Sequence, residues 1–204
     1  MTLSEFDNEI RKDYNVVCGC DEAGRGPLAG DVFAAAVIFD KDTVIEGIND
    51  SKKLTAKKCE ELFDEIMEKA VDFSIQTATV EEIEDINILN AAMLAMKRAV
   101  EDMDTKPDVC LIDGNKTPEG LECPAIAVVK GDAKSQAVAA ASILAKVARD
   151  RYMEQMAEQY PEYRFEKHKG YGTKLHYQMI DQYGPCGIHR MSFLKKYYAK
   201  KNGH

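Results

Sequence analysis

Four acidic residues stand where apolar segments of the chain begin or end, positions at which a scaffold presents functional groups. Asp21 and Glu22 follow a short apolar run, Asp113 ends another, and Asp132 precedes a long apolar stretch. Clustered carboxylates repel one another unless cations neutralise them. Their hard oxygens select Mg²⁺ or Mn²⁺, and two such ions about 3.5 to 4 Å apart can activate a water to hydrolyse a phosphodiester. The pattern thus predicts a metal-dependent hydrolytic site; alternatively, Asp113 is a turn residue and Asp132 a helix cap.

A glycine-rich segment comes directly after the first two acids. Gly24 and Gly26 allow a backbone to approach a ligand closely, and Arg25 between them suits a phosphate or a ribose. One alternative is an ordinary turn. A second alternative, a P-loop, is disfavoured because no Gly-Lys-Ser/Thr follows and the segment leads into a strand instead of opening a helix.

Short apolar or alternating runs predict the strands that position these residues. Two of them flank the glycine-rich segment and predict a hairpin. The predicted strands are 16–20, 32–39, 73–77, 109–113 and 125–129.

Apolar stripes on a 3.6-residue period predict helices between the strands. Thr55 caps a helix with its stripe from Cys59 to Ala70, and a second stripe runs from Leu89 to Met103 and ends before Pro107. Residues 136–147 are apolar or small on nearly every face, which predicts a helix buried in the core. We expect this helix to emerge into solvent at Arg149-Asp150-Arg151. Together these elements predict an α/β fold.

Charge is distributed unevenly along the 204 residues. The composition, 45% hydrophobic and 30% charged, is that of a folded globular protein, and the net charge of −8 by itself argues against a nucleic-acid partner. Residues 161–204, however, hold nine Lys or Arg against three acids, a charge of +6, and six of the nine tyrosines, leaving −14 for residues 1–160. We therefore expect a main domain, 1–160, with a basic, Tyr-rich extension, 161–204, that packs on it and contributes to substrate binding.

Neither a membrane segment nor a secretory signal is predicted. No run approaches the roughly 18 apolar residues of a membrane helix, and the first residues lack the basic and then apolar layout of a signal peptide. We expect a cytoplasmic protein with no membrane partner. The six cysteines lack a C-x-x-C pair and predict buried free thiols, although Cys18 and Cys20 have the alternative of forming half of a metal site.

Six sequence blocks, taken together and in this order, resemble one known family. The blocks are Asp21 to Gly26, Asn49 to Leu54, Ile112 to Gly114, Lys130 to Asp132, Ala140 to Val147 with Arg149 to Arg151, and His168 to Thr173 with His189-Arg190. The sequence resembles the type 2 ribonuclease H family, ribonuclease HII. The Arg-Gly pair that follows Gly24 argues against the sister type 3 enzymes.

The resemblance implies a fold and an activity. The fold would be RNase H-like, with a mixed central β-sheet flanked by helices and a C-terminal helical extension. The activity would be that of an endoribonuclease that hydrolyses the RNA strand of RNA/DNA hybrids and cuts 5′ of single ribonucleotides embedded in duplex DNA. Two-metal catalysis would leave 5′-phosphate and 3′-hydroxyl ends. The expected role is removal of misincorporated ribonucleotides and RNA primers.

The resemblance also implies roles for individual residues. Asp21, Glu22, Asp113 and Asp132 would be catalytic and would bind two divalent cations, Mg²⁺ or Mn²⁺. Gly24, Arg25 and Gly26 would read the ribose 2′-hydroxyl, which separates RNA from DNA, and Tyr171 would complete this recognition with its ring and its hydroxyl.

Other polar residues keep two interpretations each. Ser51, Lys52 and Lys53 precede a helix N-terminus, where a phosphate contact is natural; the alternative is solvated surface. Lys146 and Arg149 either pair with nearby acids or touch the substrate. Because metal-bound water needs no histidine base, we expect His168, His176 and His189 to have structural or phosphate-contacting roles.

The last helical segment raises the question of a protein partner. Residues 191–198 space an aliphatic residue and two aromatics as sliding-clamp-binding peptides do, but Met191 stands where Gln is expected. A terminal helix packed on the body is the favoured interpretation, and we expect a monomer. The alternative functions are another nuclease on the same fold, which would cut all-DNA duplexes, and a nucleic-acid-binding module without activity.

Overall fold

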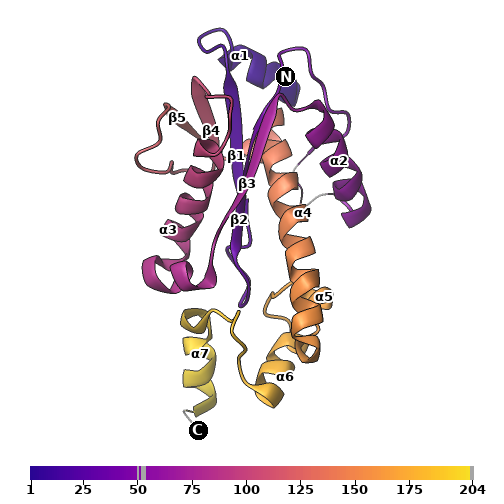
Figure 1. The fold of residues 1–204 in the computed structure, drawn as a ribbon, viewed down its shortest axis with the longest axis vertical. Coiled ribbons are helices and arrows are strands. Elements are labelled where there is room, and N and C mark those ends of the chain that lie inside the picture. The colour runs from indigo at the N-terminus through magenta and orange to yellow at the C-terminus, as the bar shows by residue number, and fades with distance from the viewer. Residues whose placement is uncertain (50, 52–53, 203–204) are drawn as a thin grey trace.

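A five-stranded mixed sheet forms the centre of the protein (Figure 1). The computed structural model describes residues 1–49, 51 and 54–202. The strands are β1 (Val17–Ala23), β2 (Val32–Ile38), β3 (Asp72–Ala78), β4 (Val109–Asp113) and β5 (Ala125–Val128), in the spatial order β3-β2-β1-β4-β5. The pairs β1/β2 and β2/β3 are antiparallel, whereas β1/β4 and β4/β5 are parallel. The predicted hairpin and the predicted mixed α/β architecture are thus confirmed.

Helices cover both faces of this sheet and extend beyond one end of it. They are α1 (Leu3–Ile10), α2 (Ala56–Lys69), α3 (Val80–Glu101), α4 (Gln136–Gln159), α5 (Phe165–His168), α6 (Lys174–Tyr183) and α7 (Met191–Asn202), with short 3₁₀ turns η2 (Gly131–Ala133) and η3 (Pro161–Tyr163). Helix α3 lies on one side of the sheet and helices α2 and α4 on the other, while α5, α6 and α7 gather beyond the sheet end opposite to α1 (Figure 1). Among the described residues, no helix is both long and apolar enough to cross a membrane.

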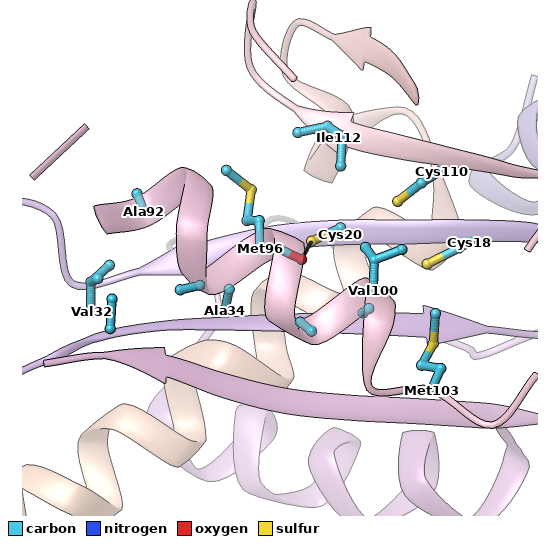
Figure 2. Close-up of a cluster of buried hydrophobic side chains, with 14 of the residues drawn as sticks. Cys18, Cys20, Val32, Ala34, Ala92, Met96, Val100, Met103, Cys110 and Ile112 are labelled. Atoms are coloured by element: carbon cyan, nitrogen blue, oxygen red, sulfur yellow. Dashed lines mark hydrogen bonds between the residues drawn. The ribbon is translucent and has the colours of Figure 1, made fainter. Parts of the chain in front are cut away.

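The core under α3 is rich in sulfur. Because strand side chains alternate between faces, Cys18 and Cys20 of β1 and Cys110 of β4 point to the same side, where they pack against Met96 and its neighbours on α3 (Figure 2). The Cys20 thiol donates to the Met96 carbonyl at 3.8 Å. Burial raises the pKa of the Cys18 thiol well above its usual value. The six cysteines are free, as predicted, but Cys123 and Cys186 are only partly buried; the buried thiols act as apolar core residues.

The opposite face of the sheet is covered by α2 and the alanine-rich part of α4. Small side chains on α4 allow the helix to lie close to the strands. The approach is closest at Gly19, where a Cβ atom would stand 2.2 Å from the backbone carbon of Ala137. Any residue larger than glycine at this position would therefore displace α4 from β1.

Two elements differ from the sequence expectation. Strand β1 continues to Ala23, so Asp21 and Glu22 lie inside the strand, where they pair with Ala35 and Ala34 of β2. Helix α3 begins at Val80, earlier than its apolar stripe suggested, and is interrupted at Asn87 (φ 67°, ψ 162°). The Asn87 side chain accepts the amides of Leu89 and Asn90, at 3.0 and 3.2 Å, and so caps the second half of the helix.

The expectation that α4 emerges into solvent at Arg149-Asp150-Arg151 is confirmed at Arg151 and wrong at Arg149. Arg149 is buried, and only Arg151 of the three residues 149–151 is exposed. The guanidinium is accommodated because it donates to the carbonyls of Asp31, Lys169 and Ala29 at 3.1 to 3.2 Å. A buried charge whose donors all find acceptors is compatible with a core position.

The C-terminal helices pack on the body of the protein through a small apolar cluster. Leu194 of α7 is fully buried against Leu28 and Ile180. This agrees with a terminal helix that packs on the body. Whether residues 161–204 form a separate unit stays a prediction.

Candidate active site

The sheet topology brings three of the predicted acids together. Parallel pairing of Cys20 with Ile112 makes Asp21 and Asp113 the next residues on β1 and β4, and alternation directs both side chains to the α4 side of the sheet. Asp132 lies in η2, immediately before α4. The amide of Gly131 donates to the Asp113 Oδ1 at 2.7 Å and ties this turn to the end of β4.

The pKa of Asp21 reflects the other negative charges close to it. Its side chain is buried, and burial raises the pKa of Asp21 well above its usual range. The charges of Glu22, Asp113 and Asp132 raise this pKa further, and the Glu22 amide, which donates to Asp21 Oδ1 at 2.7 Å, opposes the shift only in part. The cluster therefore stabilises a bound proton or cation at Asp21.

Glu22 stands slightly apart from the three aspartates. Its carboxylate accepts a hydrogen bond from the Arg25 guanidinium at 3.1 Å. Arg25 belongs to the glycine-rich loop, residues 24–30, which follows β1 directly and so places the two charges side by side. Arg25 is half-exposed, so this ion pair contributes little stability in water. Glu22 is thus the acid that a ligand can most easily recruit from its present partner.

The donor set fits divalent cations. Within the described part of the chain, no three Asp, Glu, His or Cys side chains are already gathered as a finished metal centre. Two of the acids are engaged elsewhere, since Asp113 accepts from Gly131 and Glu22 from Arg25. Nevertheless, a site made only of carboxylates, with Asp21 and Asp132 both buried, has the chemistry that Mg²⁺ and Mn²⁺ prefer.

A cavity of about 530 Å³ adjoins the acids and collects most of the other predicted residues. It is lined by Glu22, Ala23, Gly24, Arg25, Gly26, Ser51, Ile88, Ser142, Lys146, Tyr171 and Phe193. Gly24 adopts a positive φ of 98°, and a Cβ atom there would stand 2.2 Å from the Arg149 Nε. The loop thus requires glycine at this position both for its conformation and for its packing.

Tyr171 faces the glycine-rich loop across this cavity. The residue is 50% exposed, and the nearest atom to a Cβ built on Gly26 would be the Tyr171 Cε1 at 3.8 Å. The Arg149 guanidinium lies 5.9 Å from the centre of the ring. An exposed aromatic face beside an open backbone loop is suited to contact a sugar.

The predicted phosphate contacts are described only in part. Ser51 is buried, shares a hydrogen bond of 2.6 Å with Ser142 and lines the cavity. Lys52 and Lys53 lie outside the described residues. Lys146 also lines the cavity and forms an ion pair with Asp150 one turn further along α4.

Two kinds of buried polar residue lie near the cavity, and of these only Arg190 was given no role of its own from the sequence. Arg190 is fully buried and donates to carbonyls of the glycine-rich loop. His168, His176 and His189 form a buried cluster, and burial lowers the pKa of both His176 and His189 to about 4. These histidines are neutral near pH 7, in agreement with a structural role. A charged or polar residue gives no local sign in the sequence that it is buried. The only signal was that His168, His189 and Arg190 belong to the blocks, His168 to Thr173 and His189-Arg190, that resemble the family.

Comparison with known proteins places this geometry in a family context. The family model described as ribonuclease HII matches residues 18–196. The ribonuclease HII of Caldicellulosiruptor saccharolyticus is 54% identical over 189 residues, covering 93% of this chain and 92% of that protein. The ribonuclease HII of Caldicellulosiruptor bescii is 52% identical and covers 96% of this chain and 98% of its own length.

Solved structures with the same fold agree with this. Ribonuclease H2 from Pyrococcus horikoshii superposes with a TM-score of 0.75 at 28% identity, covering 91% of this chain and 97% of the other. The RNase HII in the PCNA complex from Archaeoglobus fulgidus gives 0.67 at 25% identity, with 86% and 94% covered. Bst-RNase HIII in complex with Mn²⁺, at 17% identity and a TM-score of 0.71 over 93% and 71%, shares the fold.

Proposed function

This chain belongs to the ribonuclease HII family, and from that premise we propose which bonds it cuts and how. As a ribonuclease H it is an endoribonuclease. We propose that it hydrolyses the RNA strand of RNA/DNA hybrids and cuts 5′ of single ribonucleotides in duplex DNA, leaving 5′-phosphate and 3′-hydroxyl ends. Its role would be the removal of misincorporated ribonucleotides and RNA primers, in the cytoplasm.

One observation carries the proposal: a self-repelling carboxylate cluster lies next to a cavity lined by an open glycine backbone and an exposed tyrosine. Asp21, with its raised pKa, belongs to the cluster, and Gly26 and Tyr171 face each other across the cavity. A cutting group and a sugar-contacting surface are thus neighbours. This is the arrangement that cleavage at a ribose requires.

Asp21, Glu22, Asp113 and Asp132 would hold two divalent cations, Mg²⁺ or Mn²⁺. When bound, such ions lower the pKa of a water molecule and stabilise the leaving oxygen of a phosphodiester. The chain itself supplies the placement of the acids. Strands β1 and β4 fix Asp21 and Asp113 side by side, and the Gly131 amide orients the Asp113 carboxylate.

No described histidine is needed as a base in this scheme. The three buried histidines lie in the C-terminal segment and hydrogen-bond to backbone groups or to one another. Since burial holds the pKa of His176 and His189 at about 4, they are poor proton acceptors at neutral pH. A water molecule whose pKa the bound cations would lower therefore needs no histidine base.

Recognition of the ribose would fall to the cavity. We assign contact with the 2′-hydroxyl to Gly24, Arg25 and Gly26, and packing on the sugar to Tyr171. Phosphate contacts would come from Ser51, Lys52 and Lys53, and from the basic segment 161–204, whose +6 charge offsets the acidity of the remainder. Because the cationic contacts are few, binding would be weak and sensitive to salt.

A sliding clamp is a second candidate partner, and the PCNA complex of the relative from Archaeoglobus fulgidus favours it. The segment Met191–Tyr198 would have to leave its place for this purpose, because Leu194 is fully buried in this structure. We expect the enzyme to act as a monomer.

Cleavage of three matched duplexes tests the function. One is all DNA, one carries a single ribonucleotide, and one is an RNA/DNA hybrid. We expect Mg²⁺-dependent cleavage of the last two, with the cut 5′ of the single ribonucleotide, and no cleavage in EDTA. Cleavage of the all-DNA duplex would support a different nuclease, and binding without cleavage would support a binding module; either result contradicts the proposal.

A further inference from the structure

Arg190 donates hydrogen bonds to four backbone carbonyls of the glycine-rich loop. Its Nε donates to Gly30 O at 2.8 Å, one terminal nitrogen to Arg25 O at 3.1 Å and Pro27 O at 2.9 Å, and the other to Gly24 O at 2.7 Å. The side chain is fully buried. The guanidinium, with its rigid fork of donors, therefore determines which way these carbonyls point.

This arrangement has a consequence for the opposite side of the loop. In a trans peptide, the carbonyl of one residue and the N–H of the next point in opposite directions, and the chain has no cis peptide among the described residues. Since the carbonyls of Gly24 and Arg25 point to Arg190, the amides of Arg25 and Gly26 point away from it. Within the described part of the chain, neither amide has an acceptor. Both residues line the cavity, so two backbone donors are offered there.

His189, the neighbour of Arg190, is connected to Tyr171 on the other side of the cavity by a chain of hydrogen bonds through His176. His176 Nδ1 lies 3.0 Å from the carbonyl of Tyr171, which can only accept, so Nδ1 carries the proton. Neutral His176 then accepts at Nε2, and His189 Nε2, 3.0 Å away, must donate. That leaves His189 Nδ1 as an acceptor, as its hydrogen bond of 2.9 Å from the Cys186 amide requires. Both ends of this hydrogen-bond chain thus give the same tautomers.

The His189-Arg190 pair is itself fixed to the glycine-rich loop by main-chain hydrogen bonds. The Arg190 amide donates to Leu28 O and the Gly30 amide to Ile188 O, both at 2.8 Å, and His189 forms an antiparallel bridge with Ala29. Leu28 in turn donates to Gly170 O, next to Tyr171, at 2.8 Å. One short buried segment is therefore bonded to both walls of the cavity.

We propose that the His189-Arg190 pair is the positioning element for ribose recognition: Arg190 aims the Arg25 and Gly26 amides into the cavity, and His189 holds Tyr171 opposite them through His176. The inference rests on the proposed function, because it assumes that these two walls read the ribose. Neither residue touches the substrate, and both act through the groups that they hold.

The first test measures binding of wild type and Arg190→Lys to the one-ribonucleotide duplex and to the matched all-DNA duplex, by anisotropy with Ca²⁺ replacing Mg²⁺. A lysine ammonium cannot serve four separated carbonyls, so the amides lose their alignment. The preference for the ribonucleotide should fall about tenfold or more, because small misplacements at a site have large effects. Affinity for the all-DNA duplex should stay within about twofold of wild type. Leu62→Ala, a buried change on α2 at a residue that does not line the cavity, serves as the control for lost stability alone and should keep the preference.

The second test changes His189 in the hydrogen-bond chain to Tyr171. It remains informative even if the Arg190→Lys variant fails to fold. His189→Gln retains an N–H near the position of Nε2, whereas His189→Leu has none. We expect kcat/KM on the one-ribonucleotide duplex to fall about fivefold or more in His189→Leu and to be largely rescued in His189→Gln. Equal rates in His189→Leu and wild type, or an unchanged preference in Arg190→Lys, would overturn the inference, as would an equal loss of affinity for both duplexes. A wild type without any preference would instead refute the proposed function.

Discussion

The acid cluster and the neighbouring glycine-rich loop accommodate buried charge in opposite ways. At the ends of β1 and β4, the carboxylates of Asp21 and its neighbours repel one another, and burial together with this repulsion raises the pKa of Asp21 well above its usual range. Under the glycine-rich loop, burial and the nearby Arg149 lower the pKa of Arg190 to about 9. Every nitrogen of the Arg190 side chain nevertheless donates to a carbonyl.

The difference shows which region depends on a ligand. The side-chain nitrogens of Arg149 and Arg190 all find backbone carbonyls within the protein, so the loop has its shape before substrate binds. The carboxylates accept hydrogen bonds as well, but they repel one another, so the cluster opposes folding until a proton or a cation binds. We infer that the recognition region is built for rigidity and the acid cluster for binding.

The largest expected effect comes from removing one charge of the acid cluster. Asp113→Asn keeps the shape and the Gly131 contact but loses a cation ligand, and we expect cleavage in Mg²⁺ to fall by about 10³-fold or more. Folding and hybrid binding should remain nearly intact. Single-turnover rates on the one-ribonucleotide duplex measure the loss, and cleavage that persists in this variant and in EDTA would refute the role of the cluster.

Acid should destabilise the fold through the buried histidines that lie behind Tyr171. Burial lowers the pKa of His176 and His189 from 6.5 to about 4, so the unfolded chain binds more protons between these values and stability is lost as the pH falls from about 6.5 to about 4. We expect a loss of about 3 kcal/mol for each of the two histidines over this window. Urea unfolding at a series of pH values measures it, with His176→Gln as the variant in which the slope is reduced. A slope that does not change in His176→Gln would contradict this assignment.

A smaller effect is expected at the wall of the cavity. Tyr171→Ala removes the exposed ring and should lower kcat/KM on the one-ribonucleotide duplex about tenfold. Tyr183→Ala, which removes an equally exposed ring from α6, is the matched control and should have no effect. Equal kinetics for Tyr171→Ala and wild type would show that the ring does not contact the sugar.

The smallest expected effect is a gain of stability. Because its folded pKa is raised, Asp21 destabilises the fold as the pH rises above the usual carboxyl value of 3.8, and Asp21→Asn removes this effect. In EDTA at pH 7 the variant should be more stable than wild type by about 1 kcal/mol, while it loses activity. Mg²⁺ should raise the melting temperature of wild type more than that of the variant. A variant less stable than wild type would contradict the repulsion.

Much of the fold could be predicted from the sequence, because the spacing of apolar residues differs between strands and helices. The apolar runs around Asp21 and Asp113 indicated their strands, and the capped stripe after Thr55 indicated α2. The half of α3 that precedes the kink at Asn87 was missed because the apolar stripe in the sequence begins only at Leu89. The burial of Arg149 and Arg190 could not be predicted, because a charged residue normally indicates surface and only the folded loop supplies its carbonyl partners.

Binding and cleavage measured together in Asp113→Asn test the central claim, that the acid cluster cuts while the loop and Tyr171 read the ribose. Anisotropy with the one-ribonucleotide and all-DNA duplexes gives the preference, and the same preparation gives the cleavage rate in Mg²⁺. We predict background cleavage together with a preference equal to that of wild type. Loss of the preference along with cleavage, or cleavage at the wild-type rate, would contradict the separation of the two regions.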